Sequence, residues 1–173
     1  YTTKPYYARP RYPSPADRPV YQGANPVTDV FSEKAIELVG RYLRRAYYNG
    51  YDVEARYYMM LACELASASF GHAGVHIPHA NAYPIAGMVR DYIPPDYKVD
   101  HPLVPHGISV ALTAPATFKK IAPVVPERVA KIARLLGVEP KSSHPRDVGE
   151  AAYEAFVSLI EDLKTVPRGL KEV

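Results

Sequence analysis

Apolar residues recur every three or four positions through most of the chain, which is the spacing of amphipathic helices. No stretch alternates apolar and polar residues in the way a half-buried strand does. The fold class is therefore predicted to be all-α, a bundle-like domain of five or six helices. The predicted helices lie within residues 25–50, from Asp52 to about Phe70, within 75–89 with an interruption or a restart near Pro78, and within 106–123, 126–138 and 144–166.

Capping and turn residues predict several helix ends. Thr28 or Asp29 is expected to cap the first helix, and Asn49-Gly50 is expected to end it. Pro126 suits the first turn of the fifth helix, and Gly137 suits the position after its end. The first helix is predicted to bury an apolar stripe made of Val30, Ile36, Leu38, Val39, Leu43 and Ala46.

Prolines divide the chain into regions. Residues 1–27 are rich in proline and tyrosine, and proline restricts its own backbone and that of the residue before it. We predict an extended arm there, packed on a surface because a solvated linker is seldom so aromatic. Residues 28–173 form the predicted helical domain, in which the Pro94-Pro95 pair marks one long proline-rich loop.

Composition narrows the function classes. The 173 residues are 47% hydrophobic, which is enough for a core and for one domain. The net charge of +3, from 21 basic and 18 acidic residues, is too balanced to indicate nucleic-acid binding, and no apolar run is long enough for a membrane span. Cys63 is the single cysteine, which excludes an internal disulfide and fits a reducing compartment. We expect Cys63 to be a buried structural residue.

Histidines are the candidate chemical groups. A continuous helix would align His72, His76 and His79, but the glycines and the proline among them oppose that geometry. His79 and His106 each stand at the start of a helical run, and two such histidines can converge on one metal ion. Two ligands hold a metal weakly, so a further carboxylate or histidine would be needed. Histidines satisfied within a core are the open alternative.

Four motifs in order resemble a known family: "NPVTDVFSEKAIELV", "DVEARYYMMLA", "SFGHAGVHIPHANAYPIAG" and "DHPLVPHGISVAL". Together they are similar to the helical C-terminal domain of the iron-containing (group III) alcohol dehydrogenases. The branch they resemble most is that of the hydroxyacid-oxoacid transhydrogenases. The 27-residue separation of His79 and His106 is as in that branch.

The resemblance implies a dehydroquinate synthase-like helical domain that binds a divalent metal, Fe²⁺ or alternatively Zn²⁺, through one aspartate and three histidines. It puts His79 and His106 on the last two ligand positions. The aspartate and the first histidine belong to a D-x-x-x-H motif expected before Tyr1. NAD is expected to be bound mainly by an N-terminal α/β domain that also lies outside this chain. The isolated chain is accordingly expected to be inactive.

The resemblance also implies an activity. The expected reaction converts 4-hydroxybutyrate and 2-oxoglutarate into succinate semialdehyde and 2-hydroxyglutarate, and Tyr83 is a possible substrate contact. The expected partners are these small acids and further copies of the full-length protein, with no nucleic acid and no membrane. The expected location is the cytoplasm, or the mitochondrial matrix in a eukaryote. The alternatives are a non-catalytic helical fragment acting in packing or dimerisation, and a zinc enzyme of the glycerol dehydrogenase type.

Overall fold

The computed structural model describes residues 1–95 and 97–173, and within them the chain is all-helical, as the hydrophobic pattern predicts. Within these residues the only β-type pairing is one isolated bridge, and no helix is long and apolar enough to cross a membrane. The chain divides into two compact units, Tyr1–Val75 and His76–Val173. The helices are α1 (Pro26–Tyr48), α2 (Val53–Ala73), α3 (Ile77–Met88), α4 (His106–Ile121), α5 (Pro126–Leu135) and α6 (Pro145–Asp162), with short 3₁₀ turns at Tyr6–Ala8, Pro15–Asp17 and Leu170–Glu172.

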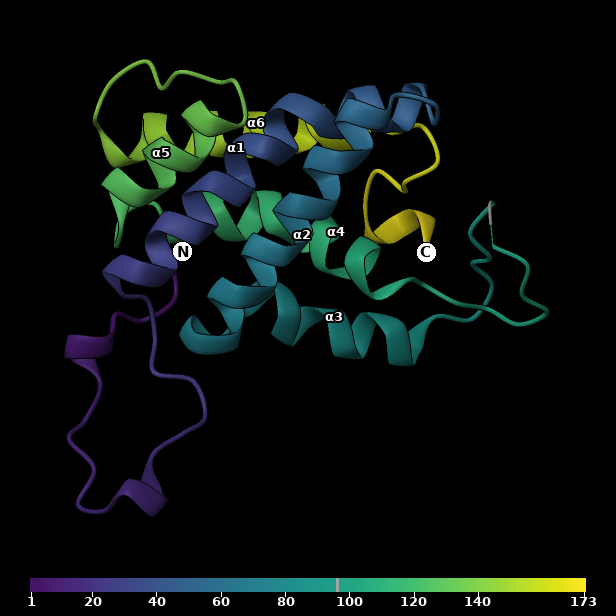
Figure 1. Cartoon of the computed structure of the whole chain (residues 1–173). Helices are drawn as coiled ribbons and strands as arrows, with labels where there is room; N and C mark the ends of the chain where they lie inside the picture. The colour runs from purple at the N-terminus through teal and green to yellow at the C-terminus, as the bar shows by residue number, and fades with distance from the viewer. Residues whose placement is uncertain (96) are drawn as a thin grey trace. The chain divides into compact units, whose positions relative to one another are not determined.

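The first unit is built on an antiparallel hairpin of α1 and α2, which pack side by side (Figure 1). Its apolar core contains Leu38, Tyr42, Ala55 and Ala62, and the Tyr42 ring stacks on a tyrosine of α2. At the other end of the hairpin, the buried Ser69 hydroxyl donates a hydrogen bond of 2.9 Å to the backbone carbonyl of a residue in the first turn of α1. Packing and a few buried polar contacts therefore fix the register of the two helices.

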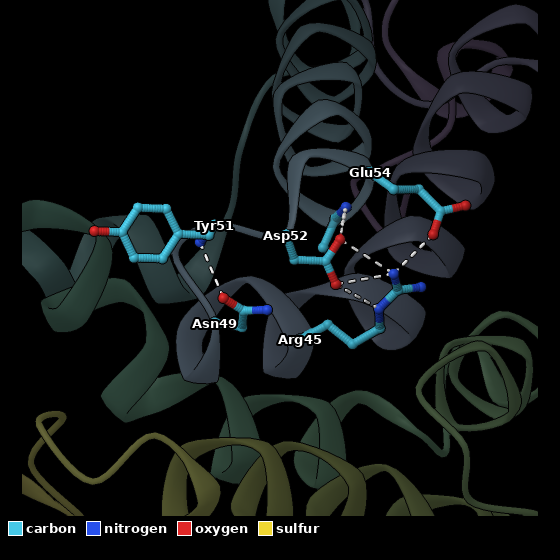
Figure 2. Close-up of polar contacts among 6 residues, drawn as sticks. Arg45, Asn49, Tyr51, Asp52 and Glu54 are labelled. Carbon is cyan, nitrogen blue, oxygen red and sulfur yellow. Dashed lines mark hydrogen bonds and ion pairs between the residues drawn. The ribbon is translucent and has the colours of Figure 1, made fainter.

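A charged cluster closes the turn between α1 and α2 (Figure 2). The Arg45 guanidinium donates to both carboxylate oxygens of Asp52, at 3.0 and 3.2 Å, and to Glu54 at 2.7 Å. Asp52 also caps α2 by accepting the Ala55 backbone N–H at 2.9 Å. This backbone hydrogen bond, together with the arginine, lowers the pKa of the Asp52 carboxyl. The carboxylate form thus both starts α2 and holds the end of α1.

Helix α1 begins earlier than the sequence analysis predicts. Asn25 is the N-cap, and its side-chain oxygen accepts the backbone N–H groups of Val27 and Thr28 at 3.1 Å each. Thr28 completes the capping box, because its hydroxyl accepts the Asn25 backbone N–H at 3.0 Å. The prediction of Thr28 or Asp29 as the cap is therefore wrong by about one turn. Pro26 occupies the first turn, where its missing N–H costs nothing.

Replacing Asn25 by alanine is expected to lower the free energy of unfolding by about 1 kcal/mol, because two backbone N–H groups lose their acceptor. Aspartate at this position keeps the acceptor and is expected to stay close to the wild-type value. Chemical denaturation of both variants checks the assignment. Equal losses for alanine and aspartate would contradict a capping role.

Two burial predictions in the first unit are wrong. Val30 of α1 is 65% exposed, whereas the buried face of the helix carries Ser32, Ala35 and Leu38. Cys63 of α2 is exposed rather than buried. Neither residue lies on the buried face of its helix, which Leu38 marks on α1 and Ala62 marks on α2.

Backbone hydrogen bonds and a bridge hold the proline-rich arm near its two ends. Pro5 forms the isolated bridge with Ala24, and the Tyr6 backbone N–H donates to the Ala24 carbonyl at 3.0 Å. Near the end of the arm, the Gln22 N–H donates to the carbonyl of His72 in the last turn of α2. Between these contacts most of the residues are exposed, with Val20 at 92%. The arm is therefore a closed loop on the hairpin.

The second unit is organised around α4, which packs against α3 on one side and α6 on the other, while α5 packs on α6. Gly149 of α6 lets that helix approach α4, because a Cβ there would lie 3.0 Å from the Lys119 carbonyl oxygen. The predicted long loop joins α3 to α4, and the Leu103 N–H donates to the Tyr92 carbonyl within it. The buried core consists of Ala122, Val129, Ala130, Ala133, Val148, Ala151 and Ala152.

Of the two alternatives predicted around Pro78, an interruption or a restart of the helix, the structure shows a restart: α2 ends at Ala73 and α3 begins at Ile77. His76 is its N-cap, so that Pro78 falls in the first turn, where proline fits a helix. The helix then continues to Met88. This placement brings His79 into the first turn as well.

Candidate metal centre

The three candidate site residues come from two helices of the second unit. His79 and Tyr83 are one turn apart on α3, so both side chains lie on the same face of that helix. His106 is the first residue of α4, directly after Pro105 at the N-cap. Because α3 packs against α4, the first turns of the two helices can present their imidazoles to each other.

The structure brings these residues together. The ring centres of His79 and His106 are 5.2 Å apart, and the ring planes are inclined by 60°. The Tyr83 ring lies 6.0 Å from that of His106, inclined by 47°. His79 is half-buried, whereas His106 is exposed and Tyr83 is 68% exposed. A ligand can therefore approach the pair from the side of Tyr83 and His106.

The separation of the two imidazoles fits one shared metal ion. A tetrahedral ion holds each imidazole nitrogen at about 2.0–2.1 Å, which puts the centres of two bound rings roughly 5 Å apart. The observed separation of the ring centres is 5.2 Å. The pair can therefore serve as two adjacent ligands with little movement of either helix.

The protonation state of His79 suits metal binding. Burial lowers the pKa of the His79 imidazole, and the nearby His106 lowers it further. A histidine binds metal as the neutral ring, whose unprotonated nitrogen supplies the electron pair. At neutral pH, His79 is thus held in the ligand form.

The remaining histidines have other surroundings. The His76 ring lies edge-on to Phe118 at 5.9 Å between ring centres, and burial lowers its pKa to about 4. His144 caps α6, because its ring nitrogen accepts the Arg146 backbone N–H. His101 lies in the long loop, hydrogen-bonded to Asp100, and His72 is exposed at the end of α2. Of these histidines, His79 and His106 are the pair whose rings lie next to each other.

Two histidines alone do not complete a metal site. Within residues 1–95 and 97–173, no group of three or more His, Cys, Asp or Glu side chains could hold a metal ion. A structural or catalytic metal site in a protein commonly takes at least three protein ligands. The pair therefore has the geometry of part of a centre.

Comparisons with known proteins show the family to which this chain is similar. The family described as "Fe-containing alcohol dehydrogenase family, C-terminal" matches residues 20–173. The mitochondrial hydroxyacid-oxoacid transhydrogenase of Homo sapiens is 45% identical over 164 residues, which are 94% of this chain and 35% of that protein. The enzyme of the same name from Xenopus laevis is 44% identical over 174 residues, covering all of this chain and 37% of that protein.

Solved structures show the same fold. An alcohol dehydrogenase from Oenococcus oeni matches 88% of this chain and 36% of its own, with a TM-score of 0.73 and 31% identity. A 1,3-propanediol oxidoreductase matches 86% of this chain and 35% of its own, with a TM-score of 0.71 and 32% identity. The chain belongs to the iron-containing alcohol dehydrogenase family and corresponds to its C-terminal helical part. It spans little more than a third of the length of the curated relatives it matches.

Proposed function

We propose that His79 and His106 supply two ligands of a divalent metal, Fe²⁺ in the first place and Zn²⁺ as the alternative, in an NAD-linked enzyme that acts on hydroxyacids. The observation that carries this proposal is the pair of imidazoles 5.2 Å apart at the first turns of α3 and α4. Family membership supports it, because the family is named for iron. The remaining ligands would come from parts of the protein outside the described residues.

The residues of this chain have distinct roles in the proposed mechanism. The bound metal would supply Lewis-acid polarisation of the substrate C–O bond. His79 and His106, as neutral ligands, hold that ion without reducing its positive charge. The exposed Tyr83 phenol beside His106 is positioned to donate a hydrogen bond to the substrate oxygen. We assign the binding of NAD mainly to the part of the protein outside this chain.

The proposed reaction is transhydrogenation between 4-hydroxybutyrate and 2-oxoglutarate. Its support is the 44–45% identity to proteins named hydroxyacid-oxoacid transhydrogenase. The names of these relatives include "mitochondrial", which supports the mitochondrial matrix as the location. We also propose that the full-length protein forms a homo-oligomer.

Product analysis of the full-length protein tests the reaction. With both acids present and no added NAD, we expect succinate semialdehyde and 2-hydroxyglutarate in equal amounts, and no product when either acid is omitted. An ordinary dehydrogenase would instead need added NAD and would form NADH from one alcohol. Removal of the metal with a chelator is expected to abolish turnover, and Fe²⁺ is expected to restore it. Product formation unaffected by the chelator would contradict the metal-dependent proposal.

Replacing Tyr83 by phenylalanine tests the role of its phenol. Loss of one neutral hydrogen bond to substrate is expected to lower kcat/KM by roughly threefold to tenfold, with the metal content unchanged. Tyr57 of α2 is similarly exposed, at 62%, so Tyr57→Phe is a matched control that should leave kcat/KM unaltered. A Tyr83→Phe enzyme with wild-type kinetics would assign Tyr83 to packing alone.

A further inference from the structure

The proline-rich arm carries several positively charged residues that have no role in the proposed metal chemistry. The loop closed by Pro5 and Ala24 contains three arginines and only one acidic residue, Asp17. Arg11 and Arg18 are exposed, as is normal for surface arginines. Arg9 differs from both, because its side chain is partly buried inside the loop.

Arg9 is held in place by its own loop. Its guanidinium carbon lies 5.5 Å from the centre of the Tyr21 ring, at a cation–π distance. The Tyr21 ring in turn packs against Gly74, because a Cβ at Gly74 would lie 2.9 Å from it. The Arg9 side chain also packs against Gly23, where a Cβ would lie 2.8 Å from the Arg9 Nε. Gly23 has a φ of 97° and leaves the space that Arg9 occupies.

This positioned guanidinium has no hydrogen-bond acceptor among the residues that the structure describes. The Arg9 Nε is buried and unpaired, and no carboxylate in the described part of the chain forms an ion pair with Arg9. Guanidinium groups that proteins hold in place are normally paired, because desolvation without an acceptor is unfavourable. A planar fork of N–H groups matches a carboxylate, which accepts two parallel hydrogen bonds from it.

We propose that Arg9 binds the carboxylate of a small organic acid on the Pro5–Ala24 loop. The choice of a carboxylate among anions rests on the proposed function, whose substrates and products are all carboxylic acids. The cation–π contact with Tyr21 and the space over Gly23 keep the fork oriented before the acid arrives. Arg90 and Lys98 also lie in a loop, but both are exposed, and no described contact orients them.

Calorimetric titration of the metal-free full-length protein tests the proposal without requiring turnover. The probe is 4-hydroxybutyrate, with 1,4-butanediol as its uncharged counterpart, at constant ionic strength. We expect saturable binding of the acid only. Arg9→Met is expected to weaken that binding by about tenfold or more, since a charge-assisted pair is lost. Arg11→Met removes the same charge from an exposed position of the same loop, and is expected to change the affinity by less than about twofold.

Three results would overturn the proposal: no saturable binding of the acid by the wild type, equal binding of the diol, or equal losses for Arg9→Met and Arg11→Met. Arg9→Lys covers the case in which the methionine variant fails to fold, because lysine keeps the charge and the apolar stem but lacks the fork. We expect Arg9→Lys to bind the acid several-fold more weakly with an unchanged Tm, and unchanged affinity would refute the role of the fork. Because binding is measured without metal or turnover, its failure is distinguishable from failure of the proposed reaction.

Discussion

Alanine at His79 or at His106 is expected to strip the metal from the full-length protein and to lower its turnover by at least about 100-fold. Loss of a residue that only supports a ligand already costs 10–100-fold, and loss of a ligand itself should cost more. The two imidazoles are 5.2 Å apart, so each variant leaves the other histidine without its partner. Metal content by elemental analysis and turnover of 4-hydroxybutyrate with 2-oxoglutarate are the measurements.

His101 and His144 provide matched controls in the same unit. His101 lies exposed in the long loop, and His144 caps α6 through its ring nitrogen. His101→Ala is expected to keep full metal content and turnover. His144→Ala is expected to lose some stability while keeping its metal, since it removes a cap and no ligand. Full metal content in the His79→Ala and His106→Ala proteins would contradict the assignment of both ligands.

Replacing Leu38 by alanine is expected to lower the free energy of unfolding by about 2–5 kcal/mol, the range for buried leucines. Leu38 is 1% exposed and lies in the cluster with Tyr42, Ala55 and Ala62 between α1 and α2. The loss combines the removed apolar contact with the cavity that remains. Denaturant unfolding of the variant gives the value.

Val30→Ala is the matched control on the same helix. Val30 is 65% exposed, so its truncation is expected to change the free energy of unfolding by no more than about 0.5 kcal/mol. If Val30→Ala cost as much as Leu38→Ala, the buried face of α1 would be assigned incorrectly. The pair therefore tests the orientation of α1 against α2.

Capping and turn residues predicted the ends of a helix well where one residue type marked the end. They were wrong where several residues could form the cap. Pro126 and Gly137 bracket α5 as predicted, since each residue suits only a narrow range of backbone conformations. At α1, the three cap-forming residues Asn25, Thr28 and Asp29 offered alternative starts, and the sequence alone did not favour Asn25. The reciprocal bonds between Asn25 and Thr28 decide the start in the folded chain. At α3, Pro78 allowed either an interruption or a restart of the helix, and the structure shows the restart, with Pro78 in the first turn.

Burial was less predictable, because helical spacing defines an apolar face but not what covers it. Val30 follows the spacing of the predicted stripe, yet the neighbouring helix packs against the face that includes Ser32. Two buried serines and a threonine carbonyl form hydrogen bonds there, which makes a polar position compatible with the interior. Cys63 is exposed because the buried face of α2 carries Ala55, Ala62 and Ser69 instead.

The sequence suggested that His79 and His106 each begin a helix and could share a metal ion, but only the resemblance to a family favoured that pairing over histidines satisfied within a core. The two residues are separated by a long loop, and no periodic pattern relates positions on different helices. The structure adds the separation of the rings and the burial that keeps His79 neutral. No sequence pattern predicts that Tyr21 and Gly23 position Arg9, because that arrangement depends on closure of the arm.

Anomalous X-ray diffraction at the iron edge, from crystals of the full-length protein, tests whether His79 and His106 bind the metal. We expect one strong peak about 2.0–2.1 Å from a ring nitrogen of His79 and of His106, with the other ligands supplied from outside the described residues. A parallel data set at the zinc edge distinguishes the two metals. A metal peak elsewhere, with the His79 and His106 rings not coordinated, would contradict the assignment of these two ligands.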